Sequence, residues 1–162
     1  MWLSVTPDGG FVVCASTTRG EPSAWRVPIA GGTPALIAAG VDRPAVSPDG
    51  RTLAGINSGA NGLLTLVTMP MDGSAPARTL GTIAPATANG LMEWTADGQG
   101  ILFSTVERAN VWLQRLDGGA PTKVTSLTDL AIVRGKRAPD GRSLILARGV
   151  AQTDAYLVSQ FK

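Results

Sequence analysis

One short turn motif recurs four times in this chain and limits the folds that it can adopt. Each copy places Asp-Gly after a Pro or Ala and before a short apolar run, as at residues 47–54. A second, Gly-rich turn signal stands between successive copies, within residues 28–34, 70–76 and 115–121. Repeats of this kind, made of several short strand-like pieces, are typical of β-propeller blades. The Asp-Gly pairs are spaced by 41, 48 and 43 residues and begin at Asp8, Asp49, Asp97 and Asp140.

The turn motif has the chemistry of a tight hairpin between two strands. Proline holds φ near about −65° at the first turn position, aspartate can bond back to the backbone, and glycine takes the left-handed conformation. In the second unit this predicts strands at 44–47, 52–57, 63–69 and 77–82. The second strand of each unit is almost wholly apolar, which fits strands packed on both faces between neighbouring blades.

The repeats divide the chain into four units, roughly 1–41, 42–89, 90–130 and 131–162. The expected fold class is all-β, a β-propeller segment of about four four-stranded antiparallel blades. The last unit has only three expected strands, the third at 155–159, so its outer strand is missing. Because a free strand edge invites pairing, we expect either the C-terminal part of a larger propeller or completion by a second copy. The first alternative is favoured.

The composition excludes several classes of active site. The 162 residues contain no histidine, which removes Ser-His-Asp and Cys-His catalysis and His-ligated zinc. The single Cys14 cannot form an intrachain disulfide, and its apolar neighbours predict a buried strand residue. The net charge of +2 gives little support to nucleic-acid binding. No apolar run is long enough to span a membrane, and the N-terminus lacks a signal-peptide pattern.

The run Ser-Pro-Asp-Gly-Arg-x-Leu-Ala at 47–54, an aromatic third strand and Asp-Gly-Gly-x-Pro at 117–121 resemble the TolB-like propeller repeat, a relative of the WD repeat. The resemblance covers essentially the whole chain. Residues 140–162 look like the C-terminus of bacterial multidomain proteins in which such a propeller follows a serine/threonine kinase or winged-helix domain. The resemblance implies a propeller that binds a ligand or a protein, and it favours a periplasmic or other extracytoplasmic location.

The clearest charge bias lies in the last unit, where Arg142 and Arg148 add to the candidate binding residues Arg134, Lys136 and Arg137. Because the first strands of propeller blades line the axis, Arg134 and Lys136 are candidates to bind an anionic group or acidic partner there. The alternative is a solvated basic face whose side chains bury only their stems. Arg137 stands where the other units carry an apolar residue, which predicts less regular packing of the last unit.

Other conspicuous residues have a structural interpretation. The four turn aspartates are equivalent, and turn chemistry accounts for their spacing without a general acid or base. Aromatic residues recur at one position of the third strands, where packing between blades is favoured over a site that stacks a sugar or base. These residues are Trp25, Trp112 and Tyr156, with Val67 in the second unit.

The function expected from the sequence is a non-catalytic propeller module for binding or scaffolding, without catalytic residues, cofactor or metal. Its partner is expected to be a protein or small ligand at the channel mouth, not nucleic acid. A second copy or further propeller blades are the other expected partners. Two alternatives stay open: an accessory, gating propeller of a serine peptidase whose hydrolase domain lies elsewhere, and a self-assembling propeller.

Overall fold

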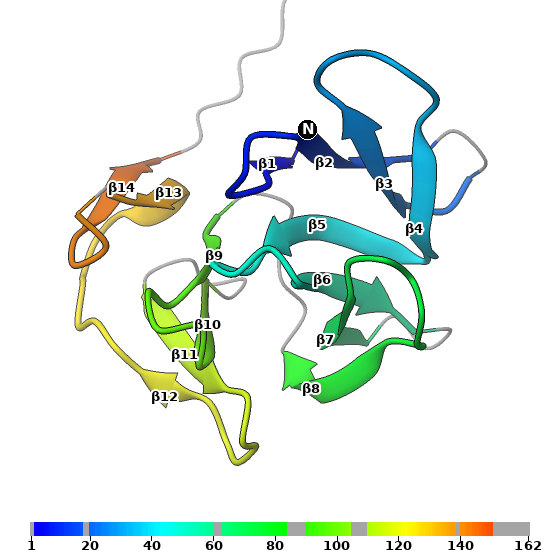
Figure 1. Cartoon of the computed structure of the whole chain (residues 1–162). Helices are drawn as coiled ribbons and strands as arrows, with labels where there is room; N and C mark the ends of the chain where they lie inside the picture. Colours follow the sequence, from blue (N-terminus) through cyan, green and yellow to red (C-terminus); the bar gives the residue numbers. More distant parts are fainter. Residues whose placement is uncertain are drawn as a thin grey trace, which may run out of the picture.

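The computed structural model describes residues 2–17, 20–59, 63–83, 90–104, 110–138 and 140–150. These residues form four antiparallel sheets set side by side around a common axis (Figure 1). Three sheets have four strands and the last has two, each in simple sequence order from the axis outward. The all-β propeller class predicted from the repeats is confirmed. The third strand expected at 155–159 lies outside the described residues.

The strands fall into four blades, numbered in chain order. Blade one comprises β1 (Leu3–Val5), β2 (Phe11–Ser16), β3 (Ser23–Pro28) and β4 (Ala35–Ala39). Blade two comprises β5 (Val41–Val46), β6 (Thr52–Ser58), β7 (Leu64–Pro70) and β8 (Arg78–Ile83). Blade three comprises β9 (Met92–Trp94), β10 (Gly100–Ser104), β11 (Val111–Arg115) and β12 (Thr122–Lys123). Blade four comprises β13 (Ala131–Arg137) and β14 (Leu144–Gly149). No helix in the described part of the chain is long and apolar enough to cross a membrane.

Each repeated turn is held by a hydrogen-bond network around its aspartate. In blade two, Asp49 Oδ1 accepts hydrogen bonds from Ser47 Oγ at 2.6 Å and from the Arg51 amide at 3.0 Å. Ser47 Oγ in turn accepts a hydrogen bond from the Thr52 amide at 2.9 Å. Gly50 has a φ of 72°, a conformation that costs glycine little and other residues more. Blades one and three repeat this network with Thr6 and Asp8 and with Thr95 and Asp97.

The turn of blade four departs from this network because Ala138 stands where the other turns carry a hydroxyl. Asp140 is bonded instead by Ser143, whose Oγ lies 2.9 Å from Asp140 Oδ2. The four turn carboxylates are thus committed to backbone turns, as the structural interpretation of the sequence predicts. The hydroxyl two residues before the aspartate belongs to the motif in three of the four turns.

Serine 47 offers a direct test of this network. Its side chain is buried and joins Asp49 to the Thr52 amide. We expect Ser47→Ala to lower the free energy of unfolding by about 1–2 kcal/mol, because the partly buried Thr52 amide loses its acceptor. Urea unfolding followed by circular dichroism measures the loss. Ala138→Ser is the reciprocal variant and is expected to leave stability unchanged or raise it; equal losses in both would contradict a hydroxyl-specific effect.

The same hydrogen bonds lower the pKa of the turn aspartates below the ordinary value of 3.8. For Asp49 the Ser47 hydroxyl is the largest cause and the Arg51 amide the next. The direction is the same for Asp8, Asp72, Asp97 and Asp140. A carboxylate with a lowered folded-state pKa stabilises the fold fully above its unfolded pKa and loses that contribution as the pH falls through the folded pKa.

The pH dependence of stability follows from these shifts. We expect the thermal midpoint to hold from neutral pH to about pH 5 and to fall as the pH drops below 3.8, the ordinary aspartate pKa. Circular dichroism melts across this range check it. A midpoint that stays constant down to the lowest pH would contradict the role assigned to the turn carboxylates.

The cores of the protein lie between successive blades. We call the sheet face that is turned toward the preceding blade the leading face, and the opposite face the trailing face. The fourth residue after a turn aspartate lies on the leading face, and the fifth lies on the trailing face. Between blades one and two, trailing Val13 packs in one cluster with leading Leu53. Between blades two and three, trailing Ala54 packs with leading Ile101. All four side chains are 0% exposed, so each interface joins two apolar sheet faces.

The predicted packing role of the third-strand residues holds where a preceding blade covers them. Val67 is buried in the core between blades one and two, and Trp112 packs against the core between blades two and three. Tyr156 lies outside the described residues. The prediction that Cys14 is buried is wrong: the residue is half-buried. It lies on the leading face of blade one, which nothing in the described structure covers.

Candidate binding site at the propeller axis

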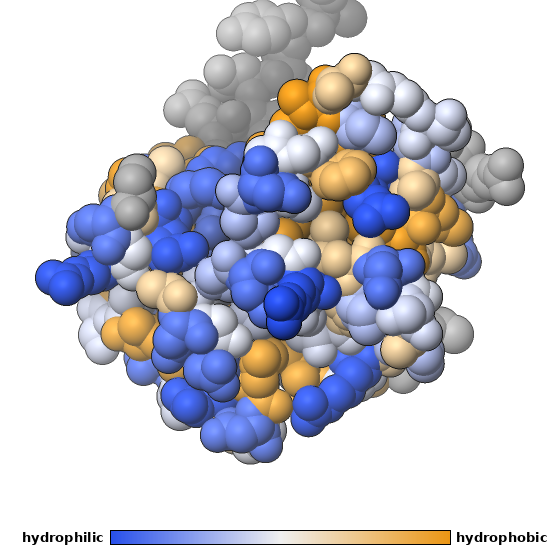
Figure 2. Space-filling view, in the orientation of Figure 1, coloured by the Kyte–Doolittle hydropathy of each residue, from blue (hydrophilic) through white to orange (hydrophobic). Residues whose placement is uncertain are grey.

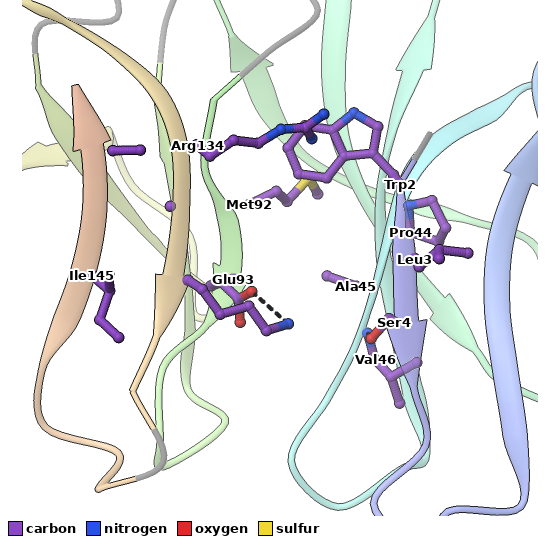
Figure 3. A pocket seen from close by; sticks show the side chains of 13 residues that line it. Trp2, Leu3, Ser4, Pro44, Ala45, Val46, Met92, Glu93, Arg134 and Ile145 are labelled. Carbon is purple, nitrogen blue, oxygen red and sulfur yellow. Dashed lines mark hydrogen bonds and ion pairs between the residues drawn. The ribbon is translucent and has the colours of Figure 1, made fainter. Parts of the chain in front are cut away.

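The first strands of the four blades surround a cleft of about 370 Å³ at the axis (Figure 3). Its floor and walls include apolar side chains such as Met92, Ala45 and Ile145. Its charged groups are Glu93, Arg134 and Lys136. A concave site with an apolar lining and a few converging polar groups is the usual form of a ligand site.

Three equivalent positions of the repeat meet beside this cleft. Trp2, Arg43 and Arg134 each stand six residues before the turn aspartate of their blade. The Arg134 guanidinium lies over the Trp2 ring, 5.5 Å from its centroid, and the Arg43 guanidinium lies 5.7 Å from the same ring. A cation over an indole face is held by the ring's electrostatic field. The indole therefore positions guanidinium groups from blades two and four.

Arg43 has an unusual environment. It lies at an irregularity in the β5–β6 register and has a φ of 51°, in the left-handed region that non-glycine residues rarely adopt. Its side chain is 9% exposed, and its Nε has no hydrogen-bond partner among the described residues. Asp42 Oδ2 lies 3.7 Å from Nε. Burial lowers the pKa of Arg43 below its ordinary value, although the charge of Asp42 opposes this shift.

Lys136 enters the cleft from β13 and pairs with a residue of blade three. Its Nζ lies 3.1 Å from Glu93 Oε1, and the lysine side chain is 69% exposed while the glutamate side chain is 17% exposed. The amine of Lys136 therefore keeps access to solvent, whereas the largely buried Glu93 depends on this partner. The exposed amine can also be reached by a ligand carboxylate.

The structure brings together two of the three basic residues singled out in the sequence. Arg134 and Lys136 line the cleft, whereas Arg137 does not. Arg137 pairs with Leu144 in the β13–β14 ladder and is half-buried, and its Nε is buried without a partner among the described residues. Of the neighbouring arginines, Arg148 donates hydrogen bonds to the carbonyls of Thr128 and Leu130. These hydrogen bonds hold β14 against the loop that precedes β13.

Sequence reasoning missed Trp2 and Arg43. Their signal is the shared position six residues before the turn aspartate, which holds Trp, Arg, Leu and Arg in the four units. Only the curvature of the arc brings these positions together at the axis. Among the described residues, no group of three or more His, Cys, Asp or Glu side chains is placed to hold a metal ion.

Comparison with known proteins places the fold. No protein-family model and no curated protein matches the sequence. The crystal structure of TolB from Acinetobacter baumannii matches with a TM-score of 0.77 and 18% identity, over 94% of this chain and 38% of that one. The chain has a TolB-like β-propeller fold.

Two further solved structures support this assignment. A TolB structure from Agrobacterium tumefaciens matches with a TM-score of 0.74 and 20% identity, over 89% of this chain and 52% of that one. A propeller in a nidogen/laminin complex matches with a TM-score of 0.70 and 17% identity, over 91% and 56%. The chain thus spans between 38% and 56% of the length of these proteins, and at such identities the likeness shows the fold alone.

Proposed function

We propose that this propeller is a non-catalytic binding module whose axial cleft receives an acidic segment of a protein partner. The observation that carries the proposal is the convergence of Arg134 and Lys136 in one apolar-lined cleft, with Arg134 held over the Trp2 ring. A pre-positioned guanidinium binds a carboxylate through charge-assisted hydrogen bonds. The neighbouring apolar wall offers contact area for the rest of the segment.

Charge and composition support a binding role. In the cleft lining, the basic Arg134 and Lys136 outnumber the acidic Glu93. The sequence has no histidine, so the cleft cannot carry His-based acid–base chemistry. The fold itself does not distinguish a binding module from an enzyme, because similar solved structures include an oligogalacturonate lyase and an acylaminoacyl peptidase as well as TolB. The peptidase-associated alternative and the kinase or winged-helix context therefore stay predictions.

Removing Arg134 is the test of this proposal. A hexaglutamate peptide is expected to bind the wild-type chain, and Arg134→Ala is expected to weaken binding roughly tenfold or more through the lost charge-assisted hydrogen bonds. Isothermal titration calorimetry at two salt concentrations measures both the loss and the expected weakening by salt.

A matched arginine variant controls for net charge. Arg115 is an exposed arginine at the end of β11, paired with Asp117 by a surface ion pair. Arg115→Ala changes the net charge as Arg134→Ala does but leaves the cleft intact, so its affinity should equal that of the wild type. Equal weakening by both variants, or no binding by the wild type, would contradict an acidic-segment site in the cleft.

A further inference from the structure

Two of the first strands of the blades pair irregularly with their neighbours, and these two strands carry the arginines that reach Trp2. The register shift of β5 contains Arg43, and that of β13 ends at Arg134. The strands β1 and β9 pair with their neighbours without a shift. A bulge bends its strand and re-aims a side chain. The irregular backbone is therefore found where a guanidinium is directed at the Trp2 ring.

The position of Arg134 depends on the Trp2 ring. Among the described residues, the Arg134 side chain has neither a hydrogen bond nor an ion pair, whereas the neighbouring Lys136 is paired with Glu93. Figure 3 shows the Arg134 side chain reaching the indole at one end of the cleft. A long arginine side chain without such a contact samples many rotamers. The orientation of the indole therefore determines where this guanidinium stands.

Arg43, by contrast, is held on its own strand. Asp42 Oδ1 accepts a hydrogen bond of 2.8 Å from the Arg43 amide, and Asp42 Oδ2 lies 3.7 Å from Arg43 Nε. This arrangement is costly, because Arg43 has a φ of 51° and its buried Nε has no hydrogen-bond partner among the described residues. Backbone strain of this kind persists where the surrounding structure imposes it, and it clusters at functional sites. Here it supplies a fixed cation beside the Trp2 ring.

We infer that Arg43 is a positioning residue, which holds the Trp2 indole and, through the indole, keeps the Arg134 guanidinium in the orientation that binds a ligand carboxylate. The inference rests on the function proposed for the cleft. Arg43 is not among the residues that line the cleft, so it acts through Trp2 and not on the ligand. Asp42 already offsets the charge of Arg43, which leaves Arg134 as the cation open to an anion. Figure 2 shows mainly hydrophilic residues around the axis, where Figure 1 places β1, β9 and β13, as a charged partner requires.

A double-mutant cycle on ligand binding tests this role. Arg43→Gln removes the cation beside the indole and is expected to weaken hexaglutamate binding roughly fivefold, the scale of a partly buried cation–π contact. In the Arg134→Ala background the same change should have no further effect, because no guanidinium is left to be positioned. Isothermal titration calorimetry measures the four affinities. A residue that only stabilises the fold, or that contacts the ligand independently, would give additive losses.

A second arginine on an aromatic ring is the matched control. The Arg26 guanidinium lies 4.9 Å from the centroid of the Phe11 ring in blade one, and neither residue lines the cleft. Arg26→Gln removes the same charge and the same kind of contact, so its affinity for the peptide should equal that of the wild type. Arg43→Lys keeps a cation but not the planar guanidinium, and a smaller loss is expected, again only where Arg134 is present. This variant takes the place of Arg43→Gln in the cycle if circular dichroism shows that the glutamine variant does not fold.

The outcomes separate this inference from the function on which it rests. Wild-type affinity in Arg43→Gln, or losses that add to those of Arg134→Ala, would overturn the positioning role and leave the binding site in the cleft intact. An equal loss in Arg26→Gln would also overturn it, because net charge alone would then account for the effect. A wild-type chain that does not bind the peptide would overturn both.

Discussion

Replacing Trp94 with alanine is expected to remove roughly 3–5 kcal/mol of folding free energy, the usual cost for a buried aromatic side chain. Trp94 is 2% exposed at the centre of the core between blades two and three. Its indole N–H donates a hydrogen bond of 2.8 Å to the Ala45 carbonyl, which lies on the first strand of blade two. The substitution therefore opens a cavity and removes a buried hydrogen bond between two blades. Because domains are stable by only about 5–15 kcal/mol, this loss is a large share of the total stability.

The variant Trp94→Phe separates packing from hydrogen bonding. Phenylalanine keeps most of the apolar volume beside Ile101 and Phe103 but cannot donate to Ala45. Its expected cost is about 0.5–1.5 kcal/mol, the usual net contribution of one hydrogen bond. Urea unfolding followed by circular dichroism measures both variants. A loss below about 1 kcal/mol for Trp94→Ala would show that blades two and three do not depend on this shared core.

The repeat signal predicts the scaffold well because it is local. Ser47-Pro48-Asp49-Gly50 specifies a hairpin by its own backbone preferences, so four copies of the motif predict four sheets. The predicted strands agree with the observed ones within a few residues where the structure describes them. Cys14 is half-buried rather than buried as predicted, and the cause of this difference is non-local. An apolar neighbourhood predicts burial only if another sheet covers that face, and the sequence motif carries no information on which blade face is covered.

The candidate site could be predicted only in part for the same reason. Arg134 and Lys136 stand out because they cluster along the chain. Trp2 and Arg43 are 41 residues apart and meet at the axis only through the curvature of the arc. The positive φ of Arg43 is also unforeseen, since the residue before a proline usually takes an extended conformation. The register irregularity of β5 accompanies this conformation.

A side chain at Gly55 is the second change with a large expected effect on stability. Comparison of the repeats predicts that a side chain is tolerated there, whereas the structure predicts a clash. The equivalent positions of the other blades, six residues after the turn aspartate, carry Cys14, Phe103 and Leu146, so a side chain at residue 55 looks acceptable. In the structure, a Cβ at Gly55 would lie 2.3 Å from Val41 Cγ1 and 3.2 Å from the Asp42 carbonyl oxygen. Val41 is 1% exposed and has little room to move.

We therefore expect Gly55→Ala to lower the free energy of unfolding by about 1–3 kcal/mol or more, the usual penalty for overpacking a core, although alanine normally loses less backbone entropy than glycine on folding. Val41→Ala removes the clashing methyl groups and costs stability by itself through a cavity. In the double variant the new methyl occupies part of that cavity. The double variant should therefore lose less stability than the sum of the losses of the two single variants. A double-mutant cycle by urea unfolding measures this coupling. Additive losses would show that the close approach of β5 to β6 at Gly55 does not limit the core.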